Sequence, residues 1–212
     1  MVESELGIMP LNWDIEHLED FINSIKDSVK KGGSTERKPY VPIDMLPMNK
    51  MTFFNSRPGE DAKSSLISFK KGDILLGAMR VYFHRVCLAP YDGTTRTTSF
   101  VLRPKSEDYL YFSLLTIFQS EVIDFAESTS KGTTIPYAVW ENGLGKFKLA
   151  LPPVNILKSF NKVVKPLFHQ MQALSKKNET LSKLRDTLLP KLLSGEIELP
   201  DTLEVIEDVP VS

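Results

Sequence analysis

Four segments of the chain combine positively charged side chains with hydroxyl and aromatic groups. They span residues 27–40, 79–85, 93–99 and 128–134. Lys and Arg neutralise phosphates, and Arg, Thr and Tyr also contact base edges, so this chemistry suits a polyanion. A charged glycine loop can equally be a solvated loop, and a threonine run can be an ordinary strand. The candidate contacts are Lys30, Lys31, Arg37, Lys38, Arg80, Tyr82, His84, Arg85, Arg96, Thr97, Thr98, Ser130, Lys131 and Thr133.

The charge of the chain is unevenly distributed. The formal net charge is −1, but residues 195–212 hold six acids and neither Lys nor Arg. Without those six, 21 acids stand against 26 bases, which gives residues 1–194 a net charge of +5. A mildly basic body with an acidic tail can bind a polyanion locally. The alternative is a neutral protein with a solvated tail.

The residues of common catalytic and metal sites do not group together in the sequence. Cys87 is the only cysteine, and the three histidines lie far apart. The stretch LPPV at 151–154 lacks the amide and the aromatic ring of the amino-methyltransferase motif. We therefore expect no catalytic residue, no metal and no cofactor. No apolar run reaches the roughly 18 residues of a membrane span, so we expect a cytoplasmic protein without membrane contact.

Short strands and one helix are expected to position these segments. Apolar and β-branched runs predict strands at 73–76, 81–88, 96–104 and 145–153, and helical spacing predicts a helix over 109–127. Alternation in the second strand would place Tyr82 and His84 on one face. This mixture, without a regular strand–helix–strand rhythm, predicts an α+β fold.

From residue 155 onward the pattern changes to a heptad repeat. Steps of four and three residues predict a long helix of coiled-coil type, with a bend or restart at Pro166, an interruption at Pro190 and an end at Gly195. Asn178 and Arg185 within the seam would fix register. The alternative is an amphipathic helix folded back on its own domain. The seam comprises Phe160, Val164, Leu167, Met171, Leu174, Asn178, Leu181, Arg185, Leu188 and Leu192.

Several stretches of the sequence resemble a known family. The C-terminal stretch LRDTLLPKLLSGEIELP (184–200) resembles the conserved region of specificity (S) subunits of type I restriction-modification systems. Residues 9–21, MPLNWDIEHLEDF, resemble the opening of their recognition domain, and residues 69–104 and 150–168 resemble its central strands and its passage into the conserved helix. Family members usually carry two recognition domains and two such helices, whereas this chain has one of each.

The resemblance implies a half-length S subunit. It implies a target-recognition domain at 1–154, a conserved helix at 155–195 for dimerisation and methyltransferase docking, and an acidic tail at 196–212. The expected partners are double-stranded DNA, a second copy of the chain, DNA-methyltransferase (M) subunits and, in a restricting complex, the restriction (R) subunit. The expected dimer interface comprises Val164, Leu167, Met171, Leu174, Asn178, Leu181, Arg185, Leu188 and Leu192.

Two functions follow from this resemblance. In the first, a homodimer recognises a split palindromic DNA site and serves as a non-catalytic scaffold for the M subunits. In the second, a truncated S-like protein or antirestriction decoy dimerises or binds methyltransferase without productive DNA recognition. In the tail, Ile197 and Leu199 alternate with acids, so we expect a short extended segment at 196–200 followed by mobile residues.

Overall fold

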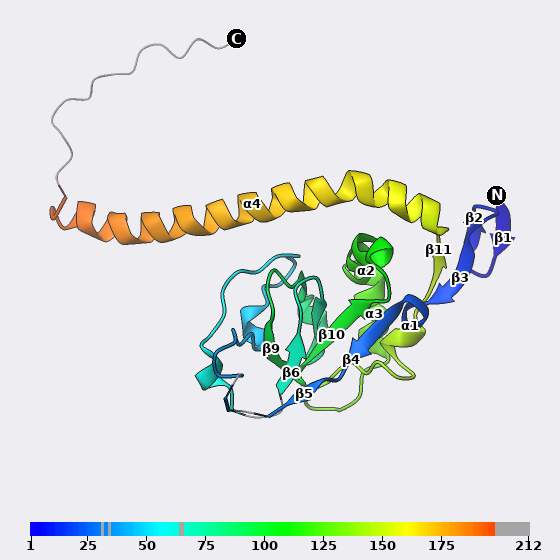
Figure 1. The fold of residues 1–212 in the computed structure, drawn as a ribbon, viewed down its shortest axis with the longest axis horizontal. Coiled ribbons are helices and arrows are strands. Elements are labelled where there is room, and N and C mark those ends of the chain that lie inside the picture. The colour runs from blue at the N-terminus through cyan, green and yellow to red at the C-terminus, as the bar shows by residue number, and fades with distance from the viewer. Residues whose placement is uncertain (31, 34, 64–65, 198–212) are drawn as a thin grey trace, which may run out of the picture. The chain divides into compact units, whose positions relative to one another are not determined.

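The computed structural model describes residues 1–30, 32–33, 35–63 and 66–197 (Figure 1). The chain divides into two compact units, Met1–His169 and Gln170–Ser212. The expectations for Lys31 and for the tail beyond residue 197 lie outside the described residues.

Short strands precede one long helix. The strands are β1 (Val2–Ser4), β2 (Gly7–Met9), β3 (Asp14–His17), β4 (Ile22–Ile25), β5 (Ser28–Val29), β6 (Leu66–Phe69), β7 (Ile74–Gly77), β8 (Val86–Leu88), β9 (Gly93–Arg96), β10 (Ser99–Pro104) and β11 (Lys148–Leu151). The α-helices are α1 (Leu18–Phe21), α2 (Leu110–Ile117), α3 (Ser120–Ser128) and α4 (Val154–Leu193). The α+β class with a long C-terminal helix is thereby confirmed.

Small antiparallel sheets build the body. The largest has the order β4-β10-β7-β8, a second has the order β5-β6-β9, and β11-β3 and β1-β2 form pairs. One apolar cluster joins the two larger sheets, because Ile67 and Phe69 of β6 pack with Leu75 of β7 and Val101 of β10. Leu75 and Val101 are also register partners and are fully buried. This core fixes the strand ends from which the candidate loops emerge.

The predicted strand at 81–88 is wrong in its first half. Residues Val81–Phe83 form a 3-10 helix, and Arg80 and His84 on either side are both left-handed, with φ of 51°. Only Val86–Leu88 is strand. Left-handed residues reverse the chain direction, so the alternation that placed Tyr82 and His84 on one face does not apply.

The predicted strand at 96–104 is two strands in different sheets. β9 ends at Arg96 and pairs with β6, whereas β10 begins at Ser99 and pairs with β4 and β7. Thr97 and Thr98 form the turn between them. The strand expected at 145–153 is shorter, because Leu144–Lys146 form a 3-10 turn before β11.

The helix predicted over 109–127 is interrupted. α2 ends at Ile117, and α3 begins after Gln119, whose φ of −72° and ψ of 140° are extended. A tertiary contact accompanies the break: Nε2 of His84 lies 2.8 Å from the Phe118 carbonyl oxygen, and the two rings lie 4.6 Å apart. That carbonyl oxygen therefore has a side-chain partner in place of a helical one.

Helix α4 runs from Val154 to Leu193 without a restart at Pro166 or an interruption at Pro190, and it ends just before Gly195, whose φ is 73°. Both prolines therefore lie inside a helix that the sequence predicted to bend or break there. Leu157 and Phe168 are its buried residues among those described. Phe168 packs against Tyr111 of α2, with the ring centroids 5.6 Å apart and the rings tilted by 57°. The start of α4 is thus part of the body.

Candidate nucleic-acid interface

Backbone hydrogen bonds join two of the candidate loops. The Arg80 amide donates to the Pro136 carbonyl oxygen at 2.8 Å, and the Ala138 amide donates to the Ala78 carbonyl oxygen at 2.8 Å. Lys131 and Tyr137 exchange two bonds of 2.9 Å across the base of the second loop. The turn at 79–85 and the loop at 129–138 therefore form one fixed surface.

The turn at Thr97–Thr98 belongs to the same surface. The Thr98 carbonyl oxygen accepts hydrogen bonds from the amides of Ala78 and Met79, at 2.9 and 3.2 Å. A cavity of about 410 Å³ opens between this turn and the loop that carries Ile135 and Tyr137. Thr97 is exposed and Thr98 half-buried, so both are accessible beside the cavity.

Arg96 ends β9 and Lys30 directly follows β5, so the two lie on the outer strands at the same end of the β5-β6-β9 sheet. Arg96 pairs with Leu66, and Leu66 pairs with Val29, which directly precedes Lys30. The Nε of Arg96 is buried and has no hydrogen-bond partner within the described part of the chain.

Two of the predicted contacts serve the protein itself. The His84 ring is held by Phe118, as described above, and an Nη1 of Arg85 donates to the Leu46 carbonyl oxygen. The Arg85 guanidinium also lies over the Phe83 ring, 5.6 Å from its centroid. Tyr82, in contrast, is 44% exposed. The turn thus keeps Arg80 and Tyr82 accessible and uses His84 and Arg85 to hold its shape.

The remaining candidates lie at differing places. Arg37 and Lys38 are exposed but precede the Tyr40 segment, which pairs in parallel with Thr94, so they lie toward the Gly93 end of β9 and not beside Arg96. The Ser130 hydroxyl donates to the Ala126 carbonyl oxygen at 2.8 Å and so closes α3. Lys131 and Thr133 are exposed.

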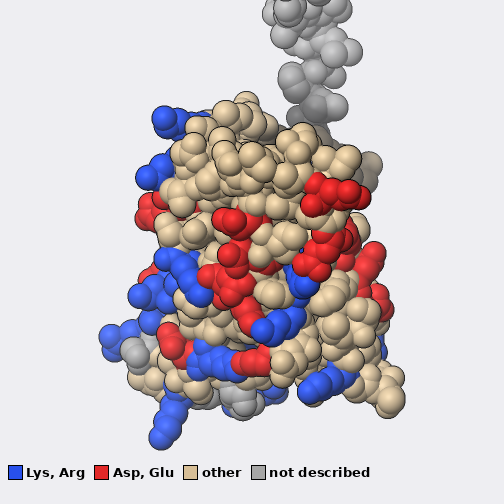
Figure 2. All heavy atoms as spheres, turned by 90° about the vertical axis from the view of Figure 1, so that its right-hand side faces the viewer, with Lys and Arg blue, Asp and Glu red and all other residues tan. Residues whose placement is uncertain are grey.

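The charges of this surface are not neutralised internally. Among the described residues, no salt bridge joins Lys30, Arg80 or Lys131 to a carboxylate. Near the N-terminal strands, by comparison, Lys148 pairs with Glu5 at 2.8 Å and Lys146 pairs with Glu19. Figure 2 shows acidic and basic side chains interspersed on the face that these strands occupy. We define the loop surface as Lys30, Arg80, Tyr82, Arg96–Thr98 and Lys131–Tyr137.

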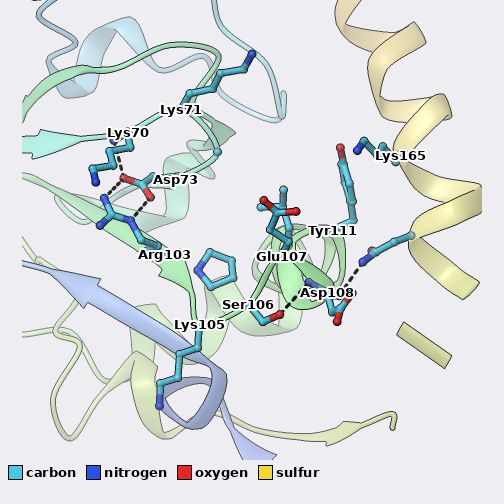
Figure 3. Close-up of a pocket in the computed structure, with 14 residues that line it drawn as sticks. Lys70, Lys71, Asp73, Arg103, Lys105, Ser106, Glu107, Asp108, Tyr111 and Lys165 are labelled. Atoms are coloured by element: carbon cyan, nitrogen blue, oxygen red, sulfur yellow. Dashed lines mark hydrogen bonds and ion pairs between the residues drawn. The ribbon is translucent and has the colours of Figure 1, made fainter. Parts of the chain in front are cut away.

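A second cavity, of about 630 Å³, was not anticipated from the sequence (Figure 3). Arg103 binds both carboxylate oxygens of Asp73 at 2.7 and 2.8 Å, and the pKa of Arg103 is raised chiefly by this hydrogen bond. The Lys70 amide also donates to Asp73, at 2.7 Å. This cluster fastens the β6–β7 turn to β10. In the sequence, the basic lining of this cavity is marked by the two adjacent lysines, Lys70 and Lys71, that precede Gly72.

Nucleophilic and metal chemistry find no support in the described residues. Burial raises the pKa of the Cys87 thiol to about 12, so the thiol stays protonated at neutral pH. Within the described residues, no three His, Cys, Asp or Glu side chains are grouped to hold a metal ion. Nor is any helix in that part of the chain both long and apolar enough to cross a membrane.

The predicted dimer residues differ in exposure along α4. Leu167, Leu174 and Leu181 are 60%, 52% and 60% exposed. Val164 and Met171 are half-buried, and Arg185 pairs with Asp186 of its own helix at 2.7 Å. Asn178, Arg185, Leu188 and Leu192 are exposed. The described part of the helix therefore carries exposed apolar side chains at heptad spacing.

Comparisons with known proteins give a consistent result. No family model matches the chain. It is 26% identical over 215 residues to the specificity subunit of the type I restriction enzyme MjaIX from Methanocaldococcus jannaschii, covering 91% of this chain and 46% of that protein. It is 22% identical over 230 residues to the putative MjaX specificity subunit of the same organism, covering 97% and 54%.

Solved structures share the fold. The HsdS subunit from Thermoanaerobacter tengcongensis matches with a TM-score of 0.60 and 18% identity over 95% of this chain and 52% of that one. The type I S subunit from M. genitalium matches with a TM-score of 0.55 and 15% identity over 86% and 46%. The chain spans about half the length of the relatives it matches. The resemblance inferred from the sequence is confirmed, because the matches are to specificity subunits of type I restriction enzymes.

Proposed function

We propose that this relative of type I restriction enzyme specificity subunits recognises a DNA sequence through its loop surface and dimerises through α4. The observation that carries the proposal is the convergence of loops distant in sequence on one surface whose Arg80 and Lys131 have no carboxylate partner among the described residues. Phosphate contacts supply affinity, and side chains at base edges supply specificity.

The surface offers both kinds of contact. Lys30 and Lys131 are exposed cations suited to phosphates, because an ammonium group is a compact point charge. Arg80, Tyr82 and Arg96 suit base edges, since an arginine fork can bond the O6 and N7 of guanine. His84 and Arg85 contribute indirectly by holding the turn.

The exposed stripe of α4 supports assembly with a second copy. Leu174, Leu181 and Leu188 recur every seven residues, so they share one helix face, and each is at least 37% exposed. An isologous dimer repeats its contacts about a two-fold axis. Two identical recognition domains would then bind identical half-sites, and the target would be a split palindrome. The paired helices would receive the M subunits and, in a restricting complex, the R subunit.

Salt-dependent binding to a duplex tests the DNA contacts. Lys131→Ala should lower the slope of log K against log salt by roughly one unit, because one phosphate contact releases about one counterion. Lys148→Ala is the matched control, because Lys148 is paired with Glu5. Equal slopes for wild type and both variants would contradict a phosphate contact at Lys131.

Methylome sequencing tests the whole proposal. Cells that express this chain with a cognate methyltransferase should show modification at a motif of two identical inverted halves. A motif with unlike halves would exclude the homodimer. Absence of any modification, with methyltransferase still bound, would instead indicate the decoy function.

A further inference from the structure

The cavity between the threonine turn and the loop at 129–138 is lined mainly by apolar groups. Its lining includes Met79, Thr97, Thr98, Ile135, Tyr137 and Trp140. Trp140 is only 6% exposed and packs near Phe100, with ring centroids 6.3 Å apart, so the floor of the recess is fixed. The threonines add methyl groups to the wall.

The rim of the recess is apolar as well. Ile135 and Tyr137 are each 47% exposed, although the backbone around them is held by the bonds from Arg80 to Pro136 and between Lys131 and Tyr137. A pre-organised loop that presents two large apolar side chains is typical of a binding surface. Because the loop is already held in place, binding a partner costs little additional conformational free energy.

The surrounding charges favour nucleic acid as that partner. Arg80 and Lys131 flank the rim, and neither has a salt bridge within the described part of the chain. The acid that lines the recess, Glu141, accepts a hydrogen bond from Lys26, which lowers the pKa of Glu141. Its charge is thus offset by Lys26. A mainly apolar recess flanked by two cations fits an apolar group on a polyanion.

In duplex DNA that group is the C5-methyl of thymine, which projects into the major groove and contacts apolar side chains and threonine methyls. We propose that the recess receives the thymine methyl group of one base pair in each half-site, with Ile135 and Tyr137 as specificity-determining residues. This inference rests on the proposed DNA recognition and names residues absent from the sequence-based candidates.

Replacing thymine by deoxyuridine removes the methyl group alone and so tests the recess directly. The target is first selected from a randomised duplex library with the full chain. Each thymine of the selected site is then replaced in turn. We expect one position per half-site at which deoxyuridine weakens binding about fourfold, the factor expected for one buried methyl group.

Variants of the recess residues test the same contact from the protein side. Tyr137→Ala and Ile135→Ala should bind the thymine and deoxyuridine duplexes with equal affinity at that position. Ile8→Ala is the control, because Ile8 is an exposed isoleucine outside both the recess and the loop surface. It should retain the fourfold difference. Circular dichroism checks folding, and the second recess variant keeps the test valid if the first is misfolded.

The two proposals fail in different ways. Sequence-preferring binding with equal affinity for thymine and deoxyuridine at every position would overturn the recess inference and leave DNA recognition intact. A selected site without thymine would overturn it too. Binding without any sequence preference would overturn the proposed function and the inference together.

Discussion

The two parts of α4 carry similar apolar side chains in different surroundings. In residues 154–169, Leu157 is fully buried, Phe168 is 5% exposed, and Asn161 donates to the Asp108 carbonyl oxygen at 2.8 Å. In residues 170–193, Leu174 and Leu181 are more than half exposed. Apolar periodicity therefore predicts a helix and its apolar face, but it does not predict whether that face packs within the chain or against another chain.

Two adjacent residues of α4, Leu167 and Phe168, differ strongly in exposure. The heptad repeat selects Leu167, yet Leu167 is 60% exposed and its neighbour Phe168 is buried against Tyr111. Residues one step apart on a helix lie about 100° apart around its axis. Phe168 therefore lies on a face of the helix that packs on its own domain, whereas Leu167 lies on a different, exposed face.

The largest expected effect is at the body-facing side. Phe168→Ala should lower the free energy of unfolding by about 3–5 kcal/mol, because it leaves a cavity beside Tyr111. Leu167→Ala is the matched control and should change it by no more than about 0.5 kcal/mol. Denaturant titration of both variants measures the difference, and equal losses would show that the two faces were assigned wrongly.

The open face should respond in assembly and not in stability. Leu174→Asp with Leu181→Asp should dissociate the dimer, because each substitution buries an unpaired charge at a helix seam. The denaturant midpoint of the body should be unchanged. Sedimentation equilibrium at micromolar concentration is the measurement, with Lys176→Asp, on the opposite helix face, as the control. A wild-type chain that sediments as a monomer would refute the homodimer.

Asn161 and Asn178 lie in the two different parts of α4 and should respond differently to substitution. Asn161→Ala should destabilise the body by about 1 kcal/mol, since the Asp108 carbonyl oxygen loses its donor. Asn178, exposed on the other part of the helix, should not affect monomer stability. Asn178→Leu should tighten the dimer while loosening its register. Thermal unfolding and dimer dissociation, measured on the same variants, separate these effects.

The smallest expected difference in stability between the two parts of α4 concerns their surface ion pairs. Lys158 lies 3.8 Å from Asp108, and Lys183 lies 2.9 Å from Glu179 one helical turn away. Both lysines are exposed, so Lys158→Ala and Lys183→Ala should each cost no more than about 0.5 kcal/mol and less in high salt. A loss above about 1 kcal/mol for Lys158 would show that its pair helps to dock α4.

Sequence reasoning found the loops but not how each side chain is used. Arg80, Thr97, Thr98 and Lys131 were predicted together and do share one surface. Tyr137 and Ile135 were missed, because an isolated aromatic or aliphatic residue in a loop has no periodicity to mark it. The backbone bonds from Arg80 to Pro136 and from Ala138 to Ala78 bring them beside the threonine turn.

The sequence by itself determined the α+β class, the long helix and the specificity-subunit resemblance, because periodicity and motifs are local properties of the chain. The tertiary structure alone decided where elements break. The His84 contact with Phe118 accompanies the division of one expected helix into α2 and α3, and two left-handed residues turn an expected strand into a 3-10 turn. Such contacts join residues distant in sequence, and their energies outweigh local propensity only once the chain is folded.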